Sequence, residues 1–179
     1  MAAMKFKFTI QGYQTDAVNS VVRVFSGQPF QDRVGYRRDA GDQDNHRNLF
    51  NWQQSDKDLF MGFANAPVSL NGAQLLHNIR EVQKGSNIKE SSSLAKHLGA
   101  CSLDVEMETG TGKTYVYIKT MFELNKRYGW SKFIVVVPSI AIREGVQKSF
   151  QTMQDHFMEQ YGKKARFFVY TSKNLTNID

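Results

Sequence analysis

The stretch METGTGKT, residues 107–114, decides the fold that we predict for this chain. Two glycines before a lysine–threonine pair are typical of a phosphate-binding loop, because glycine lets backbone N–H groups approach anionic oxygens. The full pattern, G-x-x-x-x-G-K-[ST], has a glycine at its first position, where this chain has Met107. Gly110 and Gly112, the glycines nearest the phosphates, are retained. We therefore interpret the loop as a phosphate cradle; the alternative is an ordinary strand-to-helix turn.

Two side chains of the loop have predicted chemical roles. Lys113 would reach the β- and γ-phosphates of a nucleotide, and the Thr114 hydroxyl would bind Mg²⁺. The loop therefore predicts ATP and Mg²⁺ as cofactors, with Lys113 and Thr114 as the catalytic residues. The predicted cofactor-binding residues of the loop are Thr109, Gly110, Thr111, Gly112, Lys113 and Thr114.

Strands and helices are expected to alternate around this loop. Alternating polarity or a run of bare apolar residues indicates each strand, and apolar residues at helical spacing indicate each helix. This order predicts an α/β fold over residues 102–179, in which helices flank a parallel sheet. The expected strands are residues 102–107, 133–137 and 166–170, and the expected helices are residues 114–128 and 139–161.

The first part of the chain is expected to be helical or irregular. Residues 1–30 form an N-terminal segment with a helix over residues 13–25. Residues 31–101 are expected to be an insertion or connector with one helix at residues 71–84. Within it, residues 31–58 hold 6 Asp and 5 Arg or Lys without a sustained period, which indicates a loop.

Charge and composition bound the function. The net charge is +6, and residues 113–179 account for it with 11 Lys and Arg against 5 Asp and Glu. Such a bias favours nucleic acid as a partner, although a merely basic soluble protein explains the charge equally well. No apolar run approaches the roughly 18 residues that span a bilayer, so we expect no membrane partner. The single cysteine and the absence of a secretory signal predict a reducing, cytoplasmic setting.

Three motifs resemble those of superfamily 2 helicases. METGTGKT resembles motif I, and GYQTDAV, residues 12–18, resembles the Q motif, in which a glutamine reads adenine. The resemblance implies that Gln14, with Tyr13 nearby, binds the base. VVVPSIAIREGV, residues 135–146, resembles motif Ia, whose loop contacts nucleic acid. This implies DNA contacts for Pro138, Ser139 and Arg143. From the residues alone, Gln14 could be a plain helix residue, Pro138 and Ser139 a strand end and helix cap, and Arg143 a solvated side chain.

Residues 103–146 are more closely similar to the Res subunit of type III restriction endonucleases, and YGKKARFFVYTSKNL, residues 161–175, continues the similarity. The resemblance implies the first part of a RecA-like ATPase domain. It also implies an ATP-driven motor on double-stranded DNA, which works with a modification methyltransferase (Mod) subunit and cuts through a separate nuclease domain. The alternatives are a motor of another superfamily 2 helicase or type I restriction subunit, or a non-catalytic nucleotide- or DNA-binding module.

Several parts of such an enzyme are missing from the sequence. The chain has no two adjacent acidic residues to hold Mg²⁺ and orient water, no second domain with an arginine finger, and no nuclease pattern. We therefore expect the N-terminal part of a longer polypeptide, inactive by itself, whose full-length parent is a type III site-specific deoxyribonuclease.

Overall fold

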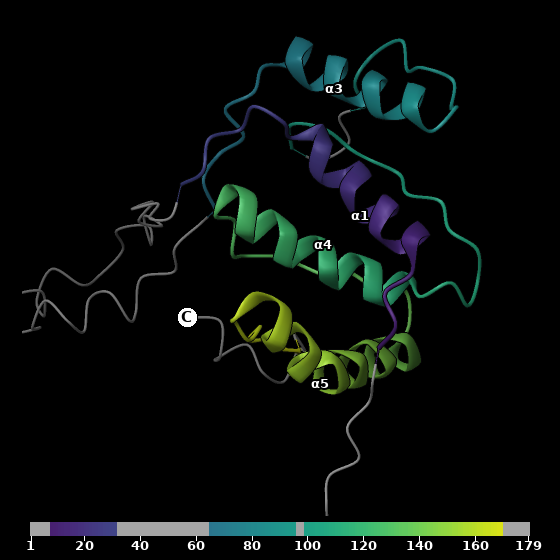
Figure 1. Cartoon of the computed structure of the whole chain (residues 1–179), viewed down its shortest axis with the longest axis vertical. Helices are drawn as coiled ribbons and strands as arrows, with labels where there is room; N and C mark the ends of the chain where they lie inside the picture. The colour runs from purple at the N-terminus through teal and green to yellow at the C-terminus, as the bar shows by residue number, and fades with distance from the viewer. Residues whose placement is uncertain (1–7, 32–64, 96–98, 170–179) are drawn as a thin grey trace, which may run out of the picture.

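The structure is a computed structural model that describes residues 8–31, 65–95 and 99–169. Helices dominate this part of the chain. Helix α1 packs against both α3 and α4, and α4 packs against α5, so the helices lie in the order α3, α1, α4, α5 (Figure 1). The helices are α1 (Gly12–Val24), α3 (Gly72–Gly85), α4 (Lys113–Tyr128) and α5 (Ile140–Tyr161).

All four expected helices are present, and each begins and ends within one residue of its predicted bounds. Local signals explain the ends. The Ser139 side chain accepts a hydrogen bond from the Ile142 N–H at 3.3 Å and so caps α5. Gly129 follows α4 with a φ of 81°, a left-handed conformation that glycine adopts without strain. Nearly all of the predicted loop at residues 31–58 lies outside the described residues.

The predicted parallel sheet is wrong. Within residues 8–31, 65–95 and 99–169 the structure contains no β-strand, so the α/β, RecA-like fold class is not what this chain shows. Residues 102–107, 133–137 and 166–169 lack regular secondary structure, and Tyr170 lies outside the described residues.

The exposure of the segment FIVVV, residues 133–137, gives the physical reason why the prediction of a sheet was wrong. Ile134 and Val136 are 91% and 89% exposed, whereas Phe133 and Val135 are 37% and 38% exposed. This period of two is that of an extended chain with one face turned to solvent. β-branched residues favour an extended backbone, but a strand also needs a neighbour that exchanges backbone hydrogen bonds with it. No such neighbour lies beside this segment in the described part of the chain.

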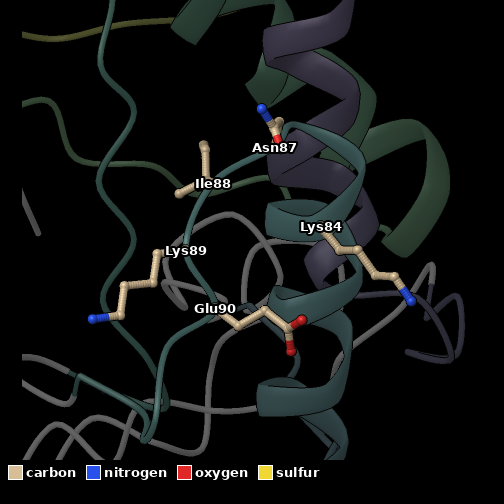
Figure 2. Close-up of a pocket in the computed structure, with 5 residues that line it drawn as sticks. All are labelled: Lys84, Asn87, Ile88, Lys89 and Glu90. Carbon is tan, nitrogen blue, oxygen red and sulfur yellow. The ribbon is translucent and has the colours of Figure 1, made fainter.

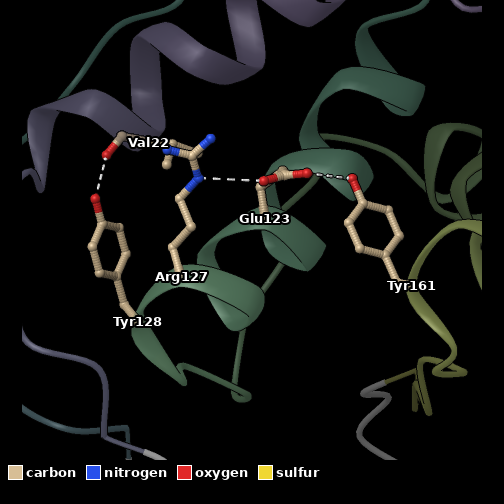
Figure 3. Close-up of polar contacts among 5 residues, drawn as sticks. All are labelled: Val22, Glu123, Arg127, Tyr128 and Tyr161. Atoms are coloured by element: carbon tan, nitrogen blue, oxygen red, sulfur yellow. Dashed lines mark hydrogen bonds and ion pairs between the residues drawn. The ribbon is translucent and has the colours of Figure 1, made fainter.

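The core between α1 and α4 combines apolar packing with buried hydrogen bonds. Val18 and Val22 of α1 are at most 1% exposed, and burial of each contributes about 1.5–3 kcal/mol to folding. The Tyr128 hydroxyl donates to the Val22 carbonyl at 2.9 Å (Figure 3). The Trp130 indole N–H donates to the Ala66 carbonyl at 3.0 Å, which ties the segment before α3 to the same core. Both of these buried side-chain donors therefore have a backbone partner.

Aromatic side chains join α4 to α5. Phe157 is 1% exposed and stacks on Phe122, with ring centroids 4.9 Å apart and an angle of 18° between the planes. Phe122 also stacks on Tyr161 at 5.1 Å. The Tyr161 hydroxyl donates to the Glu123 carboxylate at 2.8 Å, so one bond fixes the C-terminal end of α5 (Figure 3). Burial, and then the bond to Glu123, raises the pKa of Tyr161, so this hydroxyl gives up its proton less readily than an ordinary tyrosine does.

Two further features bear on where a site could lie. Within the described residues, no helix is long and apolar enough to cross a membrane. An open pocket of about 440 Å³ follows the C-terminal end of α3 and is lined by Lys84 and by residues 87–90 (Figure 2). None of the predicted nucleotide-binding residues lines this pocket, so it is not the nucleotide site.

Candidate nucleotide-binding site

The glycine-rich loop adopts a conformation that requires its glycines. Gly110 and Gly112 have φ angles of 85° and 86°, in the left-handed region that other residues enter only with strain. A Cβ atom at Gly112 would also lie 2.5 Å from the Gln14 Nε2 atom, whereas a Cβ atom at Gly110 would have nothing within 4 Å. Gly110 is therefore required by backbone conformation alone, and Gly112 by conformation and by space.

Helix α1 holds the loop through a single carbonyl group. Gln14 Nε2 donates to the Thr111 carbonyl at 3.0 Å, and the Tyr13 hydroxyl donates to the same oxygen at 3.3 Å. Gln14 is 9% exposed, whereas Tyr13 is 51% exposed. The structure thus brings the two residues of the Q-like motif onto the glycine-rich loop, 97 and 98 positions away in sequence.

A bond within the loop sets its shape. The Thr111 hydroxyl donates to the Glu108 carbonyl at 2.7 Å and closes the turn. The Thr111 hydroxyl therefore donates within the loop, and the Thr111 carbonyl accepts hydrogen bonds from α1. The sequence placed Thr111 among the cofactor-binding residues by position alone, without this bracing role.

The N-terminal end of α4 is open to an anion. Gly112 occupies the cap position of α4, no side chain caps the first turn, and this turn contains no acidic residue. The free backbone N–H groups and the helix dipole both favour negative charge at such an end. The Lys113 side chain is exposed there, as is Thr109, and Thr114 is half-buried. These residues therefore fit a phosphate group.

Residue Tyr117, one turn after Thr114, was not predicted by sequence reasoning. Its hydroxyl oxygen is buried and has no hydrogen-bond partner among the described residues. Burial raises the pKa of Tyr117, and the nearby Thr114 hydroxyl partly offsets the increase, although the two groups do not meet in hydrogen-bond geometry. An aromatic residue at helical spacing predicts a side chain in the core, so nothing in the sequence indicated that this hydroxyl lies near the loop.

The predicted DNA-contacting residues lie at the start of α5. Pro138 and Ser139 are exposed, and Arg143 is half-buried in the first turn. The Ser139 oxygen accepts the bond that caps the helix, and the Ser139 carbonyl accepts from the Arg143 N–H at 3.0 Å. The structure confirms the helix cap. The hydrogen bonds of Ser139 and Arg143 lie within α5 and do not reach the glycine-rich loop, and the role of the three residues toward DNA stays a prediction.

A histidine on α5 contacts the first turn of α4. The Tyr115 hydroxyl lies 3.1 Å from His156 Nε2, and the Phe8 ring covers the imidazole with centroids 4.9 Å apart. Burial lowers the pKa of His156, the Lys119 ammonium lowers it further, and Glu159 opposes both effects. Tyr115 is two residues from Lys113, so this contact connects the packing of α5 to the loop. The sequence did not predict this contact, because a single histidine in a helix does not indicate which residue it meets.

The lowered pKa predicts a loss of stability in acid. Because the folded chain binds a proton at His156 less readily than the unfolded chain, its contribution is present above the ordinary histidine pKa of about 6.5 and is lost as pH falls below it. We expect the urea midpoint to fall between pH 7.5 and pH 5.5, and to fall less in His156→Gln. An equal fall in both proteins would contradict a role for His156.

Metal-binding side chains are not clustered in the described residues. No group of three or more His, Cys, Asp or Glu residues there is placed to hold a metal ion.

Comparison with known proteins identifies relatives of the region that contains the glycine-rich loop. The family described as type III restriction enzyme, res subunit, matches residues 73–177. This match covers α3 from its second residue, the glycine-rich loop, α4 and α5. It begins within residues 31–101, the segment that we expected to be a connector.

Individual relatives agree with the family match. The Res subunit of the type III restriction-modification enzyme EcoP15I of Escherichia coli is 39% identical over 113 residues, which are 62% of this chain and 11% of that protein. The EcoPI Res subunit of Escherichia phage P1 is 35% identical over 124 residues, 67% of this chain and 12% of that protein. The StyLTI Res subunit of Salmonella typhimurium is 48% identical over 62 residues, 34% of this chain and 6% of that protein. The chain thus spans about a tenth of the length of the first two relatives.

Proposed function

Because the chain belongs to the family of type III restriction enzyme Res subunits, we propose that it forms the ATP-binding part of the motor of such a subunit. The observation that carries the proposal is the braced glycine-rich loop at the uncapped start of α4. A braced loop with open N–H groups is organised before its ligand arrives, so binding need not order it.

The residues of the loop divide the work of holding Mg·ATP. The backbone N–H groups from Gly110 to Gly112 face the phosphates, and the exposed Lys113 supplies a positive charge to the β- and γ-phosphates. The Thr114 hydroxyl binds Mg²⁺, which neutralises phosphate charge when the nucleotide is bound. Lys113 and Thr114 are thus the residues we assign to catalysis in the parent enzyme.

The residues Gln14 and Tyr13 extend this site toward the base. Because Gln14 Nε2 donates to the Thr111 carbonyl, Gln14 Oε1 remains to accept a hydrogen bond from the adenine amino group. The exposed Tyr13 ring lies at the same edge of the loop. One side chain thereby contacts both the base and the loop, so that adenine recognition and loop position are coupled.

In the whole enzyme, we propose that this site drives a motor on double-stranded DNA together with a Mod subunit. The relatives are named as Res subunits of restriction-modification enzymes, which supports this partnership. Pro138, Ser139 and Arg143 would contact the DNA backbone, with the Arg143 guanidinium on a phosphate. ATP turnover and DNA cleavage belong to the whole parent protein.

Calorimetric titration of Mg·ATP into the chain and its Lys113→Ala variant tests the proposal. Loss of a charged contact to phosphate is worth about 1.5–3 kcal/mol, so we expect affinity to fall by about tenfold or more. Lys84→Ala is the matched control, because Lys84 is an exposed lysine on α3 and its replacement removes the same charge far from the loop in sequence. Equal affinities in the unchanged chain and in Lys113→Ala would contradict the assignment of the loop.

A further inference from the structure

A small pocket between the C-terminal ends of α4 and α5 combines aromatic rings with positive charge. Its volume is about 200 Å³. Phe30, Phe122 and Tyr161 line it with rings, and Lys126 and Lys163 line it with ammonium groups. No carboxylate is among the lining residues. Rings beside ammonium groups are the combination that proteins use to hold a base and its phosphate.

Hydrogen bonds fix the walls of this pocket before any ligand binds. The Tyr161 hydroxyl donates to Glu123 (Figure 3). The Tyr161 ring also stacks on Phe122, so it is held at its hydroxyl and on one face. Lys163 Nζ donates to Asn125 Oδ1 at 3.1 Å, which holds one ammonium group at the rim and leaves further N–H donors on it. Phe30 is 54% exposed, so its ring is open to a stacking partner.

The charges near the pocket favour an anion. The acidic side chain of Glu123 accepts a hydrogen bond from the lining residue Tyr161 and pairs with Arg127 at 3.4 Å. Its negative charge is thereby offset next to the pocket. Lys126 adds a second ammonium group in the last turn of α4. The pocket therefore presents more positive than negative charge to a ligand.

We propose that this pocket binds one nucleobase together with its phosphate, as a unit of single-stranded nucleic acid. The base stacks on the open face of Phe30, and the phosphate lies against Lys163 and Lys126. A volume of about 200 Å³ is smaller than the roughly 300–1,000 Å³ of sites for larger ligands, which suits a single base and excludes a whole nucleoside triphosphate.

The pocket is separate from the glycine-rich loop. Helix α4 has 16 residues, so its two ends lie about 24 Å apart at 1.5 Å per residue. The loop is at one end of α4 and the pocket at the other. The inference therefore does not depend on ATP binding, and a chain with Lys113→Ala should hold the strand as well as the unchanged chain does.

Fluorescence anisotropy with a labelled oligothymidylate at constant salt tests this inference. Phe30→Ala and Lys163→Ala should each weaken binding by about tenfold, because each removes one ring or one phosphate contact. The matched controls are Phe168→Ala and Lys164→Ala, which remove an exposed ring and an exposed lysine outside the pocket. We expect the controls to change the affinity by less than about twofold. Circular dichroism checks that all four variants fold.

The remaining outcomes separate the sources of the ligand. In a second outcome, thymidine monophosphate is the probe that binds instead of the oligonucleotide. If Phe30→Ala and Lys163→Ala each weaken binding of the monophosphate by about tenfold, the pocket is supported with a free nucleotide as its ligand. Equal losses in Lys163→Ala and Lys164→Ala would overturn the inference, since only surface charge would then matter. Failure of the unchanged chain to bind either probe would overturn it, as would tighter binding of an oligoglutamate peptide with the same dependence on Lys163.

Discussion

Replacement of Gly112 by alanine is expected to destabilise the chain by about 2–3 kcal/mol and to weaken Mg·ATP binding. Alanine in the left-handed region costs about 1–2 kcal/mol by itself. Its Cβ atom would also lie 2.5 Å from Gln14 Nε2, so that side chain must move and give up its bond to the Thr111 carbonyl, at a cost of about 1 kcal/mol. Urea denaturation followed by circular dichroism measures the first effect, and calorimetry measures the second.

Gly110→Ala is the control for this prediction. Gly110 has nearly the same φ, but its Cβ atom would meet nothing within 4 Å, so only the backbone cost of about 1–2 kcal/mol applies. The difference between the two variants isolates the contact with Gln14. In a Gln14→Ala background that difference should shrink, because the side chain that blocks the Cβ atom has been removed. Equal costs for Gly110→Ala and Gly112→Ala would show that Gln14 does not lie against the loop.

Helices were predictable from the sequence because their signals are local. Apolar residues at helical spacing, the Ser139 cap and Gly129 after α4 all act within a few residues, and the helix bounds agree to within one residue. The sheet was not predictable in the same way. The apolar run at residues 133–137 indicates an extended backbone, but pairing depends on whether another strand lies alongside, which no local pattern states.

The candidate site shows the same limit. Lys113, Thr114 and the two glycines were identifiable because the spacing of the loop is itself the signal. The bonds from Gln14 and Tyr13 to Thr111 join residues almost 100 positions apart, and only the packing of α1 on α4 brings them together. The resemblance to a Q motif selected these two residues for adenine, but their bracing of the loop required the structure.

Phe157→Ala is expected to have the largest effect on stability, about 3–5 kcal/mol, because it removes a large ring from a well-packed site. Phe157 is 1% exposed and stacks on Phe122 of α4, and its ring also lies 5.5 Å from that of Tyr115. A loss of this size is a large part of the total stability of an ordinary domain, which is about 5–15 kcal/mol. The urea midpoint, followed by circular dichroism, measures the loss.

The matched control, Phe168→Ala, removes the same side chain from a site that is 79% exposed and should change stability by no more than about 0.5 kcal/mol. The shape of the Phe157→Ala transition then carries further information. Since α5 contacts α4 alone among the described helices, loss of this ring should release α5 first and leave the packing of α1 on α3 and α4 in place. Helical signal would then be lost in two steps. A single step at an unchanged midpoint would mean that the aromatic stack does not hold α5 on α4.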